Sequence, residues 1–121
     1  AGAWTASAAE LCRLVAAIDG DPTMPDVISP EAVRLMTQEM PDHQFSLGWN
    51  YTPNGRPWIR TGSLVGTSAI VLRYPDGECW VFITNTSTWK GHKFSKDTMA
   101  LFEKLRKRFG SKLPKRNLFV K

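Results

Sequence analysis

Apolar residues recur at helical spacing in the first part of the chain, in two stretches that each have a start signal and an end signal. Ser7 and Glu10 have the spacing of a capping box, and Gly20 is expected to close the first helix. A polar, proline-bearing loop follows, and Ser29-Pro30 is typical of the start of a second helix, which Pro41 ends. The apolar stripes consist of Leu11, Leu14, Val15 and Ile18 in the first helix and of Val33, Met36 and Met40 in the second. The pattern predicts two amphipathic helices that pack on a core.

After the second helix, the apolar residues change from a helical period to a period of two, which is typical of β-strands. The stretch from Phe45 to Tyr51 alternates apolar and polar side chains and predicts a half-buried strand. Asn54-Gly55 is the strongest short signal for a hairpin turn, so the chain is expected to return as a second strand, Trp58 to Thr61.

Two further strands are expected, Thr67 to Tyr74 and Cys79 to Thr84, joined by a turn at Pro75-Asp76-Gly77. They contain the runs AIVL and CWVFI, in which apolar residues are consecutive rather than alternating. Both faces of these strands are therefore expected to be covered.

A last helix is expected between a cap at Ser95 and a terminating Gly110. Its inner stripe consists of Thr98, Leu101, Phe102, Leu105 and Phe109. The order is thus two helices, an antiparallel meander of four strands and one helix. We therefore expect a single α+β unit over residues 1–121, in which helices pack on an antiparallel sheet of about four strands.

Composition agrees with a folded domain. The chain has 121 residues, of which 42% are hydrophobic, and its five Trp and six Phe exclude intrinsic disorder. A chain of this size buries enough surface to fold without a disulfide framework or a structural metal.

Cys12 and Cys79 have no CxxC spacing, so no zinc site is expected. We interpret them as small buried hydrophobes, and the sequence leaves a disulfide between them open. The chain opens without an initiator Met or a leader, which favours a processed product or an excised segment.

Charge is unevenly distributed along the chain. Residues 1–89 carry five basic and nine acidic groups, whereas residues 90–121 carry eleven basic and two acidic groups. A basic, amphipathic last helix permits a polyanion-binding module as an alternative function. Basic and aromatic residues are not interleaved there as in proteins that stack bases, so nucleic acid is not expected as a partner and a solvated basic face is the favoured interpretation.

Residues 60–63 combine residue types that suit chemistry at the edge of a sheet. Arg60 can hold a carboxylate or polarise a hydroxyl, and Thr61 can orient a polar group. Gly62 removes a side chain, so a ligand can approach the strand closely. The backbone N–H of Ser63 is suited to a developing oxyanion. Many strand ends share this composition without a function. Whether residues 60–63 form a site must therefore be judged from the elements around them.

The elements around this segment resemble, in their order, the C-terminal region of the serine β-lactamase and penicillin-binding-protein family, particularly its class C β-lactamase-like serine hydrolases. The stretch RTGSLVGTSAIVLRYPDGECWVFITN is similar to the family's Lys-Thr-Gly or His-Thr-Gly strand, the next strand and its hairpin partner. The segments AGAWTASAAELCRLVAAIDG, SPEAVRLM and FSLGWNY resemble the helix, the short helix and the strand that precede it. The basic last helix resembles the one that packs on the sheet. The resemblance covers nearly the whole chain and implies the C-terminal part of a β-lactamase/transpeptidase-like fold.

The resemblance also implies roles for the four residues. Arg60 matches the basic residue of the triad, Thr61 the hydroxyl that contacts the carboxylate or carbonyl region of the substrate, and Gly62 the glycine of close approach. The backbone N–H of Ser63 would form one half of the oxyanion hole. The family usually has Lys or His where Arg60 stands. Arginine keeps its proton at ordinary pH, so electrostatic stabilisation rather than proton relay is its implied role.

The family's nucleophile lies in a Ser-x-x-Lys motif that opens a helix, and the chain has no such motif at a helix start. Ser87 and Lys90 have the spacing but directly follow a strand, and we interpret them as coincidence. The resemblance therefore implies that an N-terminal portion of a parent protein supplies the serine and that the 121 residues are inactive alone. The implied reaction is acyl transfer through a serine ester, without metal or cofactor, in a periplasmic, envelope-associated or secreted protein.

The implied substrates are a β-lactam, a D-Ala-D-Ala-like peptide or an ester. The implied partner is the N-terminal portion, and a homodimer or an exchange of segments is expected where apolar surface normally faces that portion. Two non-catalytic alternatives remain: a degenerate family member kept as an interaction domain, and the polyanion-binding module.

Overall fold

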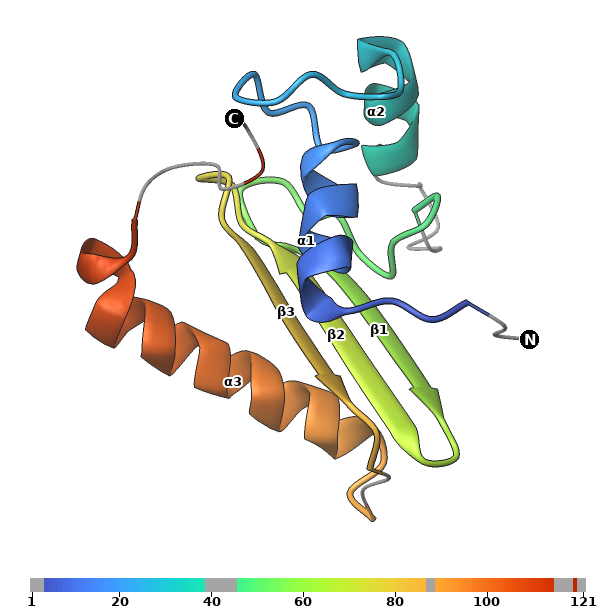
Figure 1. Cartoon of the computed structure of the whole chain (residues 1–121), viewed down its shortest axis with the longest axis vertical. Helices are drawn as coiled ribbons and strands as arrows, with labels where there is room; N and C mark the ends of the chain where they lie inside the picture. Colours follow the sequence, from blue (N-terminus) through green and yellow to red (C-terminus); the bar gives the residue numbers. More distant parts are fainter. Residues whose placement is uncertain (1–3, 39–45, 87–88, 115–118, 120–121) are drawn as a thin grey trace.

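The computed structural model describes residues 4–38, 46–86, 89–114 and 119. In these residues the chain forms an α+β arrangement of three helices and one three-stranded antiparallel sheet with the order β1-β2-β3 (Figure 1). The elements are α1 (Ala8–Ala16), α2 (Pro30–Thr37), β1 (Trp58–Leu64), β2 (Thr67–Arg73), β3 (Cys79–Thr84), α3 (His92–Phe109) and the short 3₁₀ helix η1 (Gly110–Lys112). The expected fold class is confirmed at this level.

Local signals set the starts of α1 and α2. The Ser7 hydroxyl accepts the N–H of Glu10 at 3.2 Å, and the Glu10 carboxylate accepts the N–H of Ser7 at 2.7 Å, so the expected capping box is present. Ser29 caps α2 through the N–H of Ala32, with Pro30 at the first helical position. α1 ends at Ala16 rather than at Gly20, which lies beyond the helix with φ +75°. α2 ends at Thr37, and the expected stop at Pro41 lies outside the described residues.

The sheet is a continuous meander. β1 pairs with β2 from Trp58↔Arg73 to Leu64↔Thr67, and β2 pairs with β3 from Ser68↔Thr84 to Arg73↔Cys79. The β1–β2 hairpin turns at Gly66, whose φ is +83°. The turn expected at residues 75–77 closes β2 and β3, because the N–H of Tyr74 donates to the carbonyl of Glu78 at 2.8 Å.

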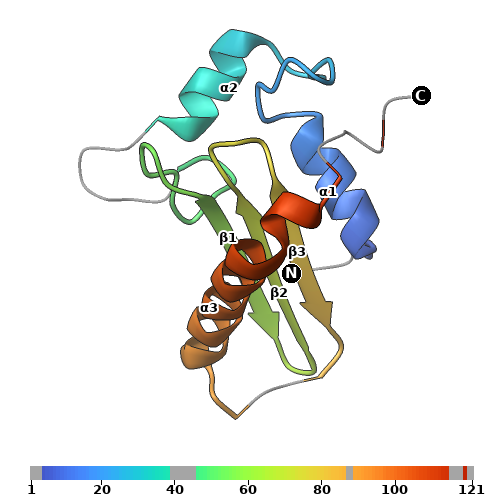
Figure 2. The same ribbon diagram turned by 90° about the vertical axis from the view of Figure 1, so that its left-hand side faces the viewer.

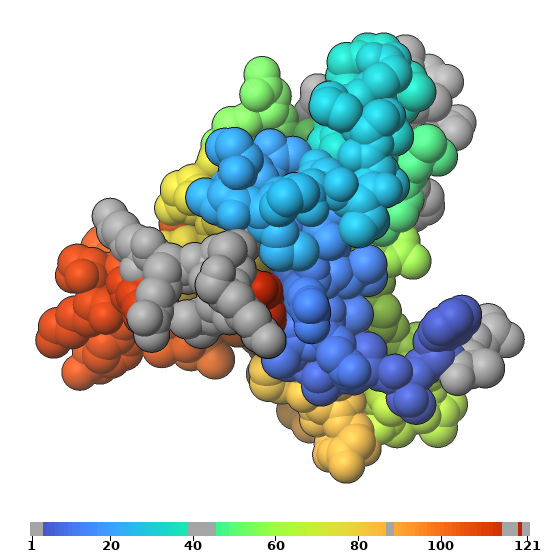
Figure 3. Space-filling model, turned by 45° about the horizontal axis from the view of Figure 1, so that its top comes forward, coloured from blue at the N-terminus to red at the C-terminus, as the bar shows by residue number. Residues whose placement is uncertain are grey.

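Helices cover both faces of β2, as the consecutive apolar residues predict. On one face, Ile70 and Leu72 pack with Phe102 of α3, and Ile70 is 0% exposed. On the other face, Val71 packs with Val15 of α1 and is 8% exposed. The two views agree that the sheet lies between α1 and α3 (Figures 1 and 2). Figure 3 shows α2 and the loop before it grouped at one end of the molecule, beside α1.

The expected strand from Phe45 to Tyr51 is not formed in the residues that the structure describes, and Phe45 lies outside them. Leu47 and Gly48 form a turn, in which Gly48 has φ +81° and Leu47 is 67% exposed. Among the described residues 46–51, only Tyr51 retains strand pairing, as a single antiparallel bridge to Ile59. The turn interrupts the period of two, so this stretch adds a bridge rather than a fourth strand to the sheet. The turn expected at residues 54–55 does form, with the N–H of Arg56 donating to the carbonyl of Pro53 at 3.2 Å.

The last helix begins earlier than expected. Gly91 is the N-cap of α3, with φ +54°, and Ser95 lies inside the helix rather than at its cap. Phe94, in the added turn, packs edge-on against Phe82 of β3 with ring centroids 5.8 Å apart. This aromatic contact holds the first turn of α3 on the sheet. Within the parts of the chain described above, no helix is both long enough and apolar enough to cross a membrane.

Candidate functional site

The four candidate residues Arg60, Thr61, Gly62 and Ser63 lie on β1, which is an outer strand of the sheet. Arg60 pairs with Val71 and therefore shares the sheet face of α1, whereas Thr61 pairs with Ile70 and shares the face of α3. Gly62 and Ser63 continue this alternation. The structure thus brings the four residues together along one strand but divides their side chains between two faces.

These residues are accessible. Arg60, Gly62 and Ser63 are exposed, and Thr61 is half-buried. A Cβ atom added at Gly62 would meet nothing within 4 Å. The packing of the described chain therefore does not itself require a glycine here, and the space above Gly62 stays open for another molecule.

Hydrogen bonds along the outer edge of β1 show which backbone groups face outward. The N–H of Ile59 donates to the carbonyl of Tyr51 at 2.8 Å, and the N–H of Thr61 donates to Oδ1 of Asn50 at 2.6 Å. Alternate residues of an antiparallel strand face the same edge, so the N–H of Ser63 also points outward. The oxyanion-binding role expected for Ser63 stays a prediction.

Asn50 is a member of this edge that the sequence reasoning missed. Its Oδ1 accepts the N–H of Thr61 and lies 3.4 Å from the Thr61 hydroxyl. In the sequence, Asn50 stands as a polar position in the alternating stretch 45–51, and its partner Thr61 is eleven residues away across a turn. The Asn50 side chain therefore occupies the edge at Thr61, and a ligand there would bind beside it or displace it.

One hollow of the described surface lies at the opposite end of β1 from Ser63. It has a volume of about 470 Å³ and is lined by residues that include Arg56, Trp58 and Arg73, but by none of residues 60–63. A smaller hollow of about 330 Å³ lies between Glu78 and α3. Residues 60–63 line neither of these two hollows and lie on an exposed outer strand, with Asn50 against its edge at Thr61.

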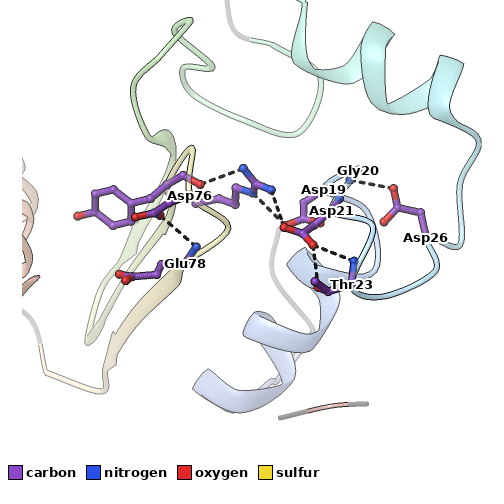
Figure 4. A network of polar contacts seen from close by, with 9 residues as sticks. Asp19, Gly20, Asp21, Thr23, Asp26, Asp76 and Glu78 are labelled. Atoms are coloured by element: carbon purple, nitrogen blue, oxygen red, sulfur yellow. Dashed lines mark hydrogen bonds and ion pairs between the residues drawn. The ribbon is translucent and has the colours of Figure 1, made fainter. Parts of the chain in front are cut away.

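A buried ion pair lies near the larger hollow. Arg73 Nε donates to Oδ2 of Asp19 at 2.9 Å, and its Nη2 lies 3.6 Å from Oδ2 of Asp21 (Figure 4). The guanidinium is 5.1 Å from the centre of the Trp58 ring. Hydrogen bonds from the hydroxyl and the N–H of Thr23 hold the pKa of Asp21 below its ordinary value. These carboxylates are partnered, so the network joins the loop after α1 to β2 and does not supply a free acid or base.

Metal binding has no support in the residues of known placement, where no group of three or more His, Cys, Asp or Glu could hold an ion. Cys12 and Cys79 are both half-buried and carry no disulfide in this structure. We expected both cysteines to be small buried hydrophobes, and each is buried only in part. The disulfide that the sequence left open is not formed in this structure.

The basic last helix has two kinds of cation. Arg106 faces inward: its Nε donates to Oε2 of Glu78 at 2.8 Å, it pairs with Asp76, and it lies over the Tyr74 ring at 3.8 Å. Five other cations of the helix are exposed: Lys93, Lys96, Lys104, Lys107 and Arg108. The inner stripe is shorter than expected, because Phe102 is buried whereas Leu101 is 50% exposed.

Comparisons with family models, with curated proteins and with solved structures found no match to this chain.

Proposed function

We propose that the chain is the C-terminal part of a β-lactamase-, DD-peptidase- or esterase-like serine hydrolase, in which β1 forms one side of an acyl-transfer cleft. The observation that carries the proposal is that residues 60–63 lie on an outer strand whose backbone N–H groups at Thr61 and Ser63 face away from the sheet. An outer strand can bind an extended acyl substrate through main-chain hydrogen bonds. The resemblance in the order of the elements supplies the reaction class.

Each residue then has a distinct role. The exposed Arg60 would attract a substrate carboxylate or stabilise negative charge that develops at the reacting carbonyl. The Thr61 hydroxyl and the Asn50 amide would bind polar groups of the substrate at the edge. The open space at Gly62 would admit the substrate backbone, and the N–H of Ser63 would donate to the oxyanion.

The nucleophile is not part of this site. No Ser-x-x-Lys motif occurs at a helix start in the 121 residues, so the proposal takes the activated serine from polypeptide beyond this sequence. The chain alone should bind substrate weakly and should not turn it over. The substrate would be a β-lactam, a D-Ala-D-Ala-like peptide or another acyl ester.

The test compares the isolated chain with the protein encoded by its complete reading frame, using a chromogenic cephalosporin and a p-nitrophenyl ester. We expect turnover only by the complete protein. Arg60→Ala should lower its kcat/KM about 10- to 100-fold, because it removes one charge-assisted hydrogen bond. Arg56→Ala is the matched control, since Arg56 is also exposed but lies outside residues 60–63. Turnover by the isolated chain that survives Arg60→Ala would contradict the proposal.

A second candidate is the polyanion-binding module, which the exposed cations of α3 favour. It predicts that the isolated chain binds heparin with an affinity that falls steeply as salt rises. Lys104→Glu combined with Lys107→Glu should abolish this binding, whereas Arg60→Ala should not. Absence of binding at low salt would remove this candidate.

A further inference from the structure

One end of the molecule exposes apolar side chains for which the fold gives no reason. The β1–β2 hairpin turns through Leu64, Val65 and Gly66, and the positive φ of Gly66 is what this turn requires. Turn positions are usually polar, yet Leu64 is 61% exposed and Val65 is fully exposed. Among the described residues, neither side chain belongs to the buried clusters that α1 and α3 form with the sheet.

Trp89 lies at the same end of the molecule. β3 ends at Thr84, which pairs with Ser68, one residue past the closing pair of the β1–β2 hairpin. The chain after β3 therefore leaves the sheet beside the hairpin turn, and both views place the start of α3 at that end (Figures 1 and 2). Trp89, just before α3, is 93% exposed. We call Leu64, Val65 and Trp89 the apolar tip.

Cations lie beside the apolar tip, at the start of α3. Lys93 and Lys96 are exposed, and the first turn of the helix holds no acidic residue. The N-terminus is the positive end of a helix dipole, so lysines there do not stabilise the helix. Asp97 is the one acidic residue of the stretch 84–100, and its Oδ2 lies 2.7 Å from Nζ of Lys90. The hairpin turn carries no charged residue, so this end of the molecule has a net positive charge.

We propose that this end of the molecule docks on a lipid bilayer with anionic headgroups, with the apolar tip inserted among the headgroups and Lys93 and Lys96 on the anionic surface. Tryptophan favours the interface of a bilayer, and apolar side chains that enter it leave water. Lysines near an anionic leaflet are attracted by its surface potential. The inference depends on neither proposed function, because it uses no residue of 60–63 and neither Lys104 nor Lys107.

Two other occupants fit this surface less well. A second copy that docked symmetrically would bring Lys93 and Lys96 of both protomers against one another, because the same patch serves both sides of such an interface. A single-stranded nucleic acid would pair with the lysines but would gain little from Leu64 and Val65, because bases stack on aromatic rings. A bilayer uses the cations and the apolar side chains together.

The test is flotation of the 121-residue chain with vesicles of phosphatidylcholine alone and of an equimolar mixture with phosphatidylglycerol. We expect binding to the mixed vesicles that weakens as salt rises, and little binding to phosphatidylcholine alone. Val65→Asp should lower the affinity for the mixed vesicles at least ~10-fold, because it removes a buried apolar side chain and adds an anion. Val27→Asp is the matched control: Val27 is also exposed, and its loop between α1 and α2 lies at the other end of the molecule (Figures 1 and 2).

A second pair of variants tests the cations. Lys93→Gln combined with Lys96→Gln should weaken binding roughly 30-fold, about fivefold for each cation that is lost. Lys107→Gln combined with Lys112→Gln is the control, and it should bind as the wild type does. Lys107 and Lys112 are also exposed, but they lie ~16 Å or more along the helix from Lys96, beyond the range of a screened charge.

Fluorescence locates the contact. Tryptophan emission should shift to shorter wavelength on the mixed vesicles, and Trp89→Phe should remove most of this shift, because Trp89 leaves water. Three results would overturn the proposal: no binding to the mixed vesicles at low salt, equal binding by the two members of either matched pair, and self-association through Val65 in place of vesicle binding. The wild-type measurement requires no variant to fold, and circular dichroism shows whether each variant retains the helices.

Discussion

Removing the carboxylate of Asp19 should destabilise the fold strongly, because it leaves the buried Arg73 guanidinium without its main partner. The Arg73 side chain is 11% exposed and that of Asp19 is 4% exposed, and the two are joined by a hydrogen bond of 2.9 Å. The second oxygen of Asp19 accepts the N–H of Asp21 at 3.0 Å. Asp19→Ala therefore removes the charge partner of Arg73 on β2. It also removes the acceptor for the N–H of Asp21 in the loop after α1.

The size of this destabilisation depends on the contacts that Arg73 keeps in the Asp19→Ala variant. Breaking a buried ion pair by removing one partner costs ~3–5 kcal/mol. Arg73 keeps a contact of 3.6 Å with Asp21 and a hydrogen bond of 2.9 Å to the carbonyl of Tyr74, which favours the lower end of that range. A loss of about 3 kcal/mol lowers the melting temperature by about 12 °C, for ~2.1 cal/mol/K of unfolding entropy per residue.

The assay is urea unfolding followed by tryptophan fluorescence, because Trp58 lies beside this guanidinium and reports on its surroundings. Glu31→Ala is the control, since its pair with Arg34 has exposed fractions of 64% and 61% and should leave the midpoint unchanged. Adding Arg73→Met to Asp19→Ala should recover most of the stability, because both buried charges are then gone. The reasoning is refuted if Asp19→Ala unfolds at the same urea concentration as Glu31→Ala.

Three further predictions test the fold by thermal and urea unfolding. Phe102→Ala should cost ~3–5 kcal/mol because it leaves a cavity between α3 and the sheet, whereas Leu101→Ala, at a half-exposed position, should cost far less; equal losses would contradict the packing. Burial, with a hydrogen bond to Glu103, raises the pKa of Tyr74, so the folded protein holds this proton after the unfolded chain has lost it. The free energy of unfolding should therefore fall as pH rises above about 10. Tyr74→Phe should reduce this fall, measured as the difference between the urea midpoints at about pH 8 and pH 11. The same difference in Tyr74→Phe and wild type would contradict the prediction. Gly55→Ala should cost about 1 kcal/mol for its positive φ, and Gly77→Ala should cost more, because its Cβ would also meet Asp21 Oδ2 at 2.8 Å; the reverse order would count against the turn geometry.

Features encoded by neighbouring residues were predictable from the sequence. The caps at Ser7 and Ser29 depend on residues within one helical turn, and both form as expected. The coverage of β2 on both faces follows from its consecutive apolar residues, which an alternating strand would not contain. The strand expected after the Asn54-Gly55 turn, Trp58 to Thr61, forms and runs on to Leu64, so Gly62 and Ser63 lie on it as well.

Features that depend on distant contacts were not predictable. Gly48 adopts a positive φ that the alternating pattern around it does not reveal, so the expected fourth strand is reduced to one bridge. The start of α3 is fixed by packing of Phe94 on β3, which outweighs the capping preference of Ser95. The contact of Asn50 with Thr61 crosses a turn, and no local pattern in the sequence predicts it.

The most direct test of the proposed function is to locate a covalent acyl adduct by mass spectrometry. The protein from the complete reading frame is incubated with a β-lactam, digested and sequenced, in the wild-type form and as the Arg60→Ala and Arg56→Ala variants. The account predicts an adduct on a serine outside the 121 residues, formed more slowly in Arg60→Ala than in Arg56→Ala. An adduct on a residue of this chain, or equal acylation rates in the two variants, would contradict the assignment of β1 as a side of the acyl-transfer cleft.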